Sequence, residues 1–318
     1  METLHSMSDP QQHWADNKER GSFRLMKLTA WGVKLLGRRV LAPVLYAIVL
    51  YFFLFGGRAR RSIWQYQQRL ADWSGQAALR PTRRRVFAQF MCFADALLDK
   101  LDVWNGKLSI HDIEIVDPAR LRDQLRGERG QMLVGAHLGN LEVCRALAEL
   151  GEQVTMNVLV HTKHAEQFNR LLGEAGASHL RLIQVSELNP AVMLQLNQRL
   201  ENGEWLAIAG DRVPLHGGRN VQVNFLGHPA VFPQGPWLLA GLLKCPVNLM
   251  FCLKQAGRYR VILEPFADAV HWRRSDREHV IADWTARYAE RLGHYCLQAP
   301  HQWFNFYPFW KTDDDASA

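Results

Sequence analysis

The sequence predicts an α/β fold in which a mixed, mostly parallel central sheet is flanked by helices and follows an N-terminal helical segment. From about residue 108 onward, short apolar runs alternate with amphipathic stretches, which is typical of strands that alternate with helices. Between residues 62 and 104, apolar side chains recur at three- and four-residue spacing, which indicates helices. The 318 residues are 48% hydrophobic and 22% charged, so the chain can bury a large core and is not generally disordered.

The expected elements follow in order along the chain. Pro81 separates two N-terminal helices, and residues 221–227 are expected to form an antiparallel strand or one arm of a hairpin. The other predicted strands are residues 108–116, 131–139, 154–160, 180–185, 204–211, 247–254 and 258–265, the last two joined by a turn at Ala256-Gly257. The predicted helices are residues 140–150, about 165–175, 190–202, 236–244 and 276–297.

This pattern divides the chain into an N-terminal membrane-associated helical region (1–104), an α/β domain (105–312) and a terminal tail (313–318) that is expected to fray. The five cysteines are scattered along the chain without a Cys-x-x-Cys pair. Their spacing does not fit a disulfide framework or a zinc finger, and it therefore indicates a reducing, cytosolic setting.

Residues 40–55 form an apolar run of sixteen residues without a charge, with basic residues on both flanks. The run is slightly shorter than the ~17–25 residues of a membrane-spanning helix. About 39 mixed polar residues precede it, which does not fit a signal peptide. Three interpretations follow: a short span of the inner membrane, a monotopic helix that dips into one leaflet with its arginines on lipid phosphates, or a buried core helix. The flanking cations and nearby Trp and Tyr residues favour membrane contact.

The net charge of +7 is concentrated near the N-terminus, because residues 17–85 carry +13 and the rest of the chain carries −6. A basic segment needs an anionic partner, which points to a membrane surface, an acidic carrier protein or a nucleic acid. The sequence has no helix-turn-helix signature, aromatic ribonucleoprotein motif or zinc knuckle, so nucleic-acid binding is not expected.

The clearest candidate for chemistry is His137, at the end of an apolar strand, with Glu142 five residues later. In α/β sheets, sites lie beyond the carboxyl ends of the strands. If a helix begins near Leu138, the Glu142 carboxylate reaches back toward the imidazole, and the amides of the helix start face a developing oxyanion. A histidine oriented by a carboxylate suits a general base, and Gly139 lets a substrate approach closely. The alternative is a structural histidine at a strand end, with Glu142 on a solvated helix face.

A series of sequence blocks carries a family resemblance. The blocks are Arg61-Ser62, the HLGNLE run from His137, Ala209-Gly210-Asp211-Arg212, Phe225-Leu226-Gly227 followed by Pro233-Gln234-Gly235-Pro236, and Gln302-Trp303-Phe304-Asn305-Phe306. HLGNLE fits the His-x4-acidic (HX4E) motif of glycerolipid acyltransferases. Over about residues 20–310, the chain resembles the lipid A biosynthesis (late) acyltransferase family, within the lysophospholipid/glycerolipid acyltransferase superfamily. Arg212 stands where glutamine is expected in the lipid A enzymes, which indicates a divergent branch.

The resemblance implies an O-acyltransferase of lipid A, lipopolysaccharide or specialised lipid biosynthesis at the cytoplasmic face of the inner membrane. Such an enzyme moves a fatty acyl group from an acyl carrier protein or acyl-CoA thioester to a hydroxyl of a membrane lipid or glycolipid, without a metal or cofactor. His137 and Glu142 are then the catalytic residues. The substrate-binding candidates are Gly139, Asn140, Asp211, Arg212 and Arg219.

Two other functions are compatible with the same residues: a non-catalytic membrane-associated lipid-binding protein, and a hydrolase that uses the pair on water. His161 and His164 have a spacing that can ligate zinc, but neither an HExxH pattern nor a third ligand accompanies them, so no metal is expected. The aromatic residues at 303–310 are expected in core packing or at a membrane edge.

Overall fold

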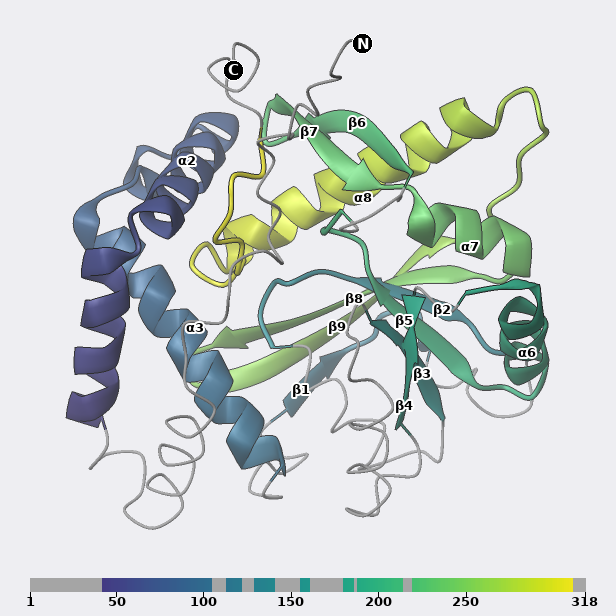
Figure 1. The fold of residues 1–318 in the computed structure, drawn as a ribbon, viewed down its shortest axis with the longest axis horizontal. Helices are drawn as coiled ribbons and strands as arrows, with labels where there is room; N and C mark the ends of the chain where they lie inside the picture. Colours follow the sequence, from purple (N-terminus) through teal and green to yellow (C-terminus); the bar gives the residue numbers. More distant parts are fainter. Residues whose placement is uncertain are drawn as a thin grey trace, which may run out of the picture.

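The computed structural model describes residues 42–104, 113–121, 129–140, 155–160, 180–185, 188–213 and 219–310. Seven strands form one sheet in the order β1-β9-β8-β2-β5-β3-β4, and β6 and β7 form a separate two-stranded sheet. Figure 1 shows the large sheet in the middle of the molecule, with the N-terminal helices along one side and α7 and α8 above it. The predicted α/β class and the mostly parallel sheet are confirmed.

Most strands of the large sheet run in one direction. β8, β2, β5, β3 and β4 are parallel, whereas β9 is antiparallel to β8 and pairs with β1 in parallel. The strands are β1 (Ile113–Val116), β2 (Met132–Gly135), β3 (Met156–Val160), β4 (Leu180–Gln184), β5 (Trp205–Ala209), β6 (Asn220–Phe225), β7 (His228–Pro233), β8 (Val247–Gln255) and β9 (Arg258–Ala267). Ala256 and Gly257 have φ angles of 48° and 81°, which suit the tight turn predicted between β8 and β9. The hairpin arm predicted at 221–227 is also confirmed, because β6 and β7 pair in antiparallel.

The helices begin and end close to the predicted positions. They are a helix at Ala42–Phe55, α2 (Gly57–Ser74), α3 (Arg83–Trp104), α6 (Pro190–Glu201), α7 (Gly235–Leu243) and α8 (Arg277–Gln298), with a 3₁₀ turn at Ala77–Leu79. α6 begins where Asn189 accepts a hydrogen bond from the Val192 amide at 3.0 Å and Pro190 fills the first position. The helices predicted at 140–150 and 165–175 lie outside the described residues.

The side chains of the central strands alternate between the two faces of the sheet. In β2, Met132 and Val134 belong to the larger core cluster, which also contains residues of α6, α7, α8 and the β6-β7 hairpin. Leu133, between them, belongs to a second cluster with Tyr259 and Val261 of β9. Successive strand residues point to opposite faces, so the sheet is buried on both sides, as expected for parallel strands.

The helix at Ala42–Phe55 meets α2 at a bend of 88°. Gly56 permits this bend, because a Cβ atom there would collide with the Phe52 carbonyl oxygen. No single helix among the described residues is both long and apolar enough to cross a membrane, although this bent pair qualifies by its combined length and composition. Val49 of the first helix packs with Ile63 and Phe90 in a third core cluster. The N-terminal helices therefore pack on one another.

The C-terminal segment joins these helices to the sheet. Trp303, Phe309 and Trp310 are buried in the larger core cluster. The Trp303 ring lies 4.9 Å from the ring of Tyr66 on α2, and Phe225 of β6 stacks on Trp310 at 5.5 Å. The prediction of core packing for the aromatic residues at 303–310 is confirmed for these three.

Candidate active site

His137 and Asp211 meet because β2 and β5 are neighbours in the sheet. The parallel register pairs Gly135 with Ala209, and the Gly210 amide donates to the Gly135 carbonyl at 2.9 Å. His137 lies two residues beyond Gly135, and Asp211 lies two residues beyond Ala209. The two residues are therefore equally far beyond the ends of their strands. The pair therefore sits at the carboxyl edge of the parallel strands, where α/β sheets place their ligands.

The Asp211 carboxylate accepts three hydrogen bonds. Its Oδ1 lies 2.8 Å from Nδ1 of His137, and its Oδ2 accepts from the His137 backbone amide at 2.9 Å and from the Trp303 indole at 3.0 Å. The Asp211 side chain is 2% exposed, whereas that of His137 is 32% exposed. A buried carboxylate thus fixes one edge of an imidazole that remains accessible to a ligand.

The environment of Asp211 keeps its carboxylate ionised. Burial is the largest single influence, and it raises the pKa of Asp211 because it disfavours the charged form. The charge of His137, the hydrogen bonds from His137 and the charge of Arg212 act in the opposite direction and prevail, so the pKa of Asp211 is lowered from its ordinary value. The carboxylate is therefore a permanent negative partner for the imidazole at neutral pH.

Residues 138–140 do not begin a helix, and the prediction of a helix start near Leu138 is wrong. Leu138 forms an antiparallel bridge with Trp303, and Gly139 forms a parallel bridge with Cys252. The Gly139 amide donates to the Gln302 carbonyl at 2.8 Å, and the Asn140 amide donates to the Cys252 carbonyl at 2.9 Å. These two amides, like that of His137, are engaged in hydrogen bonds within the protein and are not available to an oxyanion.

A chain of buried polar groups connects the N-terminal helices to this pair. Gln67 on α2 donates to Gln89 on α3 at 3.0 Å, and Gln89 donates to the Trp303 carbonyl at 2.8 Å. Both glutamines are at most 1% exposed, and the indole of the same Trp303 binds Asp211. Because buried polar groups need partners, this chain fixes the backbone of the segment that holds the carboxylate.

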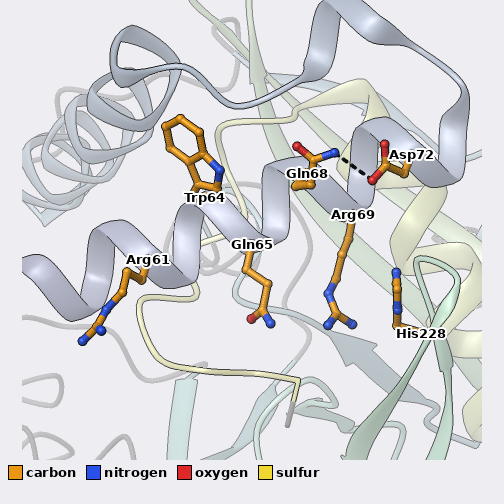
Figure 2. Close-up of a pocket in the computed structure, with 7 residues that line it drawn as sticks. All are labelled: Arg61, Trp64, Gln65, Gln68, Arg69, Asp72 and His228. Atoms are coloured by element: carbon orange, nitrogen blue, oxygen red, sulfur yellow. Dashed lines mark hydrogen bonds between the residues drawn. The ribbon is translucent and has the colours of Figure 1, made fainter. Parts of the chain in front are cut away.

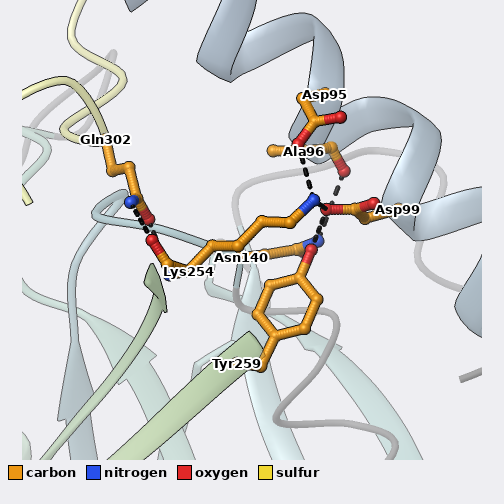
Figure 3. A network of polar contacts seen from close by, with 7 residues as sticks. All are labelled: Asp95, Ala96, Asp99, Asn140, Lys254, Tyr259 and Gln302. Carbon is orange, nitrogen blue, oxygen red and sulfur yellow. Dashed lines mark hydrogen bonds and ion pairs between the residues drawn. The ribbon is translucent and has the colours of Figure 1, made fainter. Parts of the chain in front are cut away.

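A second polar cluster lies beside Asn140 (Figure 3). Lys254, near the end of β8, contacts Asp95 at 2.6 Å and Asp99 at 2.7 Å, and the Tyr259 hydroxyl also donates to Asp99. The amide of Gln302 bonds the backbone of Lys254 in both directions, at 2.9 and 2.7 Å. These contacts hold α3 and the C-terminal segment against the carboxyl edge of the sheet.

A cavity of about 350 Å³ opens at this cluster. Gly139 and Asn140 line it together with Phe304, whose backbone amide donates to the His137 carbonyl at 2.8 Å. The lining also includes Lys254 and Asp99, so a few charged groups stand among a lining that is otherwise largely apolar. The cavity is thus continuous with the backbone segment that carries the histidine.

The other predicted site residues are placed as follows. Glu142 lies outside the described residues, as do His161 and His164. Asn140 is buried, and its side chain donates to the Ala96 carbonyl on α3 at 3.3 Å. Arg212, next to Asp211, donates to the Phe304 carbonyl at 3.2 Å. Arg219 is exposed just before β6 and makes no side-chain hydrogen bond or ion pair within the described part of the chain.

The sequence did not predict a role in the site for Gln67, Gln89 or Trp303. A signal for the two glutamines exists, since each interrupts an apolar helical stripe: Gln67 follows Ile63 and Tyr66, and Gln89 precedes Phe90. A polar side chain on a buried helix face must find a partner. The sequence gives no indication that this partner is residue 303, more than 200 positions away.

The described residues contain no group of three or more His, Cys, Asp or Glu side chains arranged to hold a metal ion.

A comparison with curated proteins finds no match. Residues 85–312 match the family described as bacterial lipid A biosynthesis acyltransferase. This match covers most of the chain and includes the β2 and β5 strand ends as well as the C-terminal segment. The protein belongs to the bacterial lipid A biosynthesis acyltransferase family and is an acyltransferase.

Proposed function

We propose that the protein is an O-acyltransferase in which His137, held by Asp211, activates the hydroxyl of a lipid acceptor for attack on an acyl thioester. The observation that carries the proposal is the 2.8 Å contact between Nδ1 of the accessible His137 and the buried carboxylate of Asp211. A histidine in this arrangement is a general base of the kind that acyl transfer to an alcohol requires.

The proposed reaction begins with the neutral imidazole. Asp211 accepts a hydrogen bond from the Nδ1–H group and stays ionised, which holds the ring in the tautomer whose lone pair is on Nε2. Nε2 takes the proton of the acceptor hydroxyl as the oxygen attacks the thioester carbonyl, and the Asp211 charge stabilises the imidazolium that forms. The tetrahedral intermediate then breaks its carbon–sulfur bond, and Nε2 returns the proton to the departing thiolate. The products are an ester and a free thiol.

Asp211 takes the positioning role in this scheme instead of the substrate-binding role that the resemblance implies. Its two carboxylate oxygens are directed at His137 and Trp303, and its side chain is 2% exposed. Glu142 remains a proposed catalytic residue. Because Nδ1 contacts Asp211, the orienting contact at that nitrogen is assigned to Asp211 instead of to Glu142.

We propose that the donor is acyl carrier protein or acyl-CoA and that the acceptor is a membrane lipid or glycolipid. The proposed substrate contacts are Gly139, Asn140, Arg212 and Arg219. Gly139 and Asn140 line the cavity of about 350 Å³ at the sheet edge, which combines apolar surface with a few polar groups. Arg212 follows Asp211 directly, at the same edge as His137.

We propose that the helix Ala42–Phe55 docks at the cytoplasmic face of the inner membrane without crossing it. At ~1.5 Å per residue, its fourteen residues extend for about 21 Å, which is shorter than the ~30 Å hydrocarbon core of a bilayer. Its two sides also differ: Val49 is buried in the third core cluster, whereas Tyr51 is 57% exposed and Phe55 is 67% exposed. A helix with one packed side and one exposed apolar side suits a monotopic anchor.

The test of the catalytic proposal is acyl transfer by the full-length protein. A labelled acyl carrier protein or acyl-CoA is incubated with extracted membrane lipids, and the labelled ester is measured. We expect His137→Ala to lower kcat by about 10²–10⁴-fold, the usual contribution of a general base. The matched control is His279→Ala, which removes an exposed histidine on α8 and should leave the rate unchanged.

Three results would contradict the proposal. Full activity of His137→Ala would exclude the general base. Release of free fatty acid at the same rate with and without lipid would indicate a hydrolase. Lipid binding by the wild type without any turnover of either thioester would indicate a binding protein. Circular dichroism of each variant shows whether the fold is retained.

A further inference from the structure

A groove of about 420 Å³ runs along α2 to the start of β7, and neither His137 nor Asp211 lines it (Figure 2). Arg61, Gln65 and Arg69 follow one another at four-residue spacing, so they share one face of the helix. His228, at the start of β7, closes the groove beyond Arg69, and Trp64 stands on the neighbouring helix face. The helix and the hairpin thus present several nitrogen donors to one concave surface.

The two arginines of this groove lack carboxylate partners. Within the described residues, no acidic side chain forms an ion pair with Arg61 or Arg69. Asp72 also lines the groove, but it accepts from Gln68 at 2.8 Å and lies 3.9 Å from Arg80. Among the described lining residues, Asp72 is the one acid beside two arginines, and it forms no ion pair with either of them.

Arg69 is held in place by packing instead of by an anion. Its guanidinium lies 4.6 Å from the centre of the Trp310 ring, which is itself buried. Partial burial lowers the pKa of Arg69, and burial together with the charge of Arg69 lowers the pKa of His228. A planar guanidinium that is oriented by stacking keeps its N–H groups available for a phosphate, which it can bind with two hydrogen bonds.

The groove begins close to the exposed apolar helix. A single residue, Gly56, separates that helix from α2, and Arg61 lies in the first turns of α2. In the described part of the chain, most of the large exposed hydrophobic side chains fall between residues 44 and 64: Val44, Tyr46, Leu50, Tyr51, Phe52, Leu54, Phe55 and Trp64. An apolar surface lies next to two arginines that form no ion pair within the described residues. This combination suits the boundary between the acyl chains and the phosphates of a leaflet.

We propose that Arg61 and Arg69 bind the phosphate of a membrane lipid headgroup while the exposed side chains of Ala42–Phe55 insert among the acyl chains. The inference rests on the membrane docking proposed above and adds a defined phosphate site to it. One apolar helix gives only weak, reversible attachment, and a second contact is needed for stable anchoring. The groove supplies that contact and fixes how the body is oriented on the membrane.

The test is binding of the full-length protein to two kinds of vesicle, measured by flotation. One kind contains phosphatidylethanolamine and phosphatidylglycerol. The other consists of galactolipid with oleate, which matches the surface charge but contains no phosphate. The groove variant is Arg61→Gln/Arg69→Gln. The control Arg273→Gln/Arg274→Gln removes two exposed arginines from the segment before α8, at the far end of the molecule in Figure 1.

We expect the wild type and the control variant to bind the phosphate-containing vesicles at least fivefold more tightly than the charge-matched ones. The groove variant should lose this preference and keep the residual binding of its apolar helix. An unchanged preference in the groove variant, or an equal loss in the control variant, would overturn the inference.

A parallel titration uses acyl carrier protein without vesicles. If the groove variant loses only carrier binding and keeps the preference for phosphate vesicles, the groove binds the acyl carrier protein, and the lipid inference is wrong. Failure of the wild type to bind either vesicle would overturn both the groove and the membrane docking. Transfer to a detergent-dispersed acceptor measures the catalytic proposal separately.

Discussion

The indole nitrogen of Trp303 lies 3.0 Å from Oδ2 of Asp211, the oxygen that also accepts the backbone amide of His137. Three segments that are distant in sequence therefore meet at one carboxylate: the end of β2, the end of β5 and the C-terminal segment. Since Trp303 also accepts a hydrogen bond from Gln89 on α3, its backbone and its side chain are both fixed. This arrangement leads to specific expectations for single substitutions.

Replacing Asp211 by Asn should impair the chemical step far more than it impairs binding. An amide cannot stabilise the imidazolium, and it favours the wrong tautomer of His137, so we expect kcat to fall by about 10³–10⁴-fold with a similar KM. ¹⁵N NMR of the imidazole should report the change of tautomer. Glu142→Gln is the comparison. If Asp211→Asn were fully active while Glu142→Gln was inactive, the positioning role would belong to Glu142 and not to Asp211.

The stability contributed by Asp211 should depend on pH. Its pKa is lowered in the folded protein, so the ionised form stabilises the fold. This contribution is fully present above the ordinary carboxyl pKa of about 3.9 and is lost as the pH falls through the lowered value. Urea unfolding should therefore separate the wild type from Asp211→Asn most widely at neutral pH, and the separation should shrink below about pH 4. A constant separation would contradict the assigned ionisation.

Trp303→Phe should reduce activity while it preserves most of the aromatic packing. The variant loses one hydrogen bond to Asp211, so the carboxylate is less well oriented, and we expect kcat to fall by roughly tenfold or more with little change in KM. The control is Trp310→Phe, which removes an equally buried indole that donates to the Phe225 carbonyl at 3.2 Å. Equal losses of activity in the two variants would show that the effect comes from packing alone.

Gln67 and Gln89 should be energetically coupled. Gln89→Leu leaves the Trp303 carbonyl without its donor, and such a loss costs about 1–3 kcal/mol. It also removes one of the two acceptors of the Gln67 amide, which keeps the Arg85 carbonyl at 3.2 Å. In a double-mutant cycle with Gln67→Leu, the double variant should be less destabilised than the sum of the single variants, because two apolar side chains can pack together. Strictly additive unfolding free energies would contradict the direct contact.

Gly139→Ala should prevent correct formation of the site. Gly139 has a φ of 74°, and an added Cβ would collide with the Cys252 carbonyl oxygen. Gly75→Ala is the matched control, since Gly75 has a φ of 69° but open space around it. We expect a loss of about 1 kcal/mol for Gly75→Ala and a much larger loss, with little folded protein, for Gly139→Ala. Thermal unfolding of both variants measures the difference.

The sequence predicted the strands well because the pattern that defines them is local. Apolar runs such as residues 131–139 and 204–211 carry enough information to identify β2 and β5, and the end of the first run singles out His137. Asp211 was predicted only from the family resemblance, and as a substrate-binding residue. The sequence did not predict that the two residues touch. β3 and β4 come between β2 and β5 along the chain, and only the tertiary strand order places β5 beside β2.

The error at Leu138 has the same origin. Glycine and asparagine after an apolar run fit a helix start when only neighbours in sequence are considered. In the structure, the competing partners of residues 138–140 are Cys252 and the 302–304 segment, more than 100 residues away. Long-range backbone pairing thus overrides the local preference at the point where the site is formed.

The polar chain from Gln67 through Gln89 to Trp303 has a practical consequence for work on the isolated enzyme. Removing residues 1–104 to obtain a soluble fragment would take away Gln89, the hydrogen-bond partner of the Trp303 carbonyl. It would also delete Tyr66 and Leu70 from the larger core cluster and expose the side chains that pack against them. The anchor and the catalytic body cannot be separated at that boundary. A soluble form should instead come from polar substitutions at Tyr51 and Phe55, which leave α2 and α3 in place.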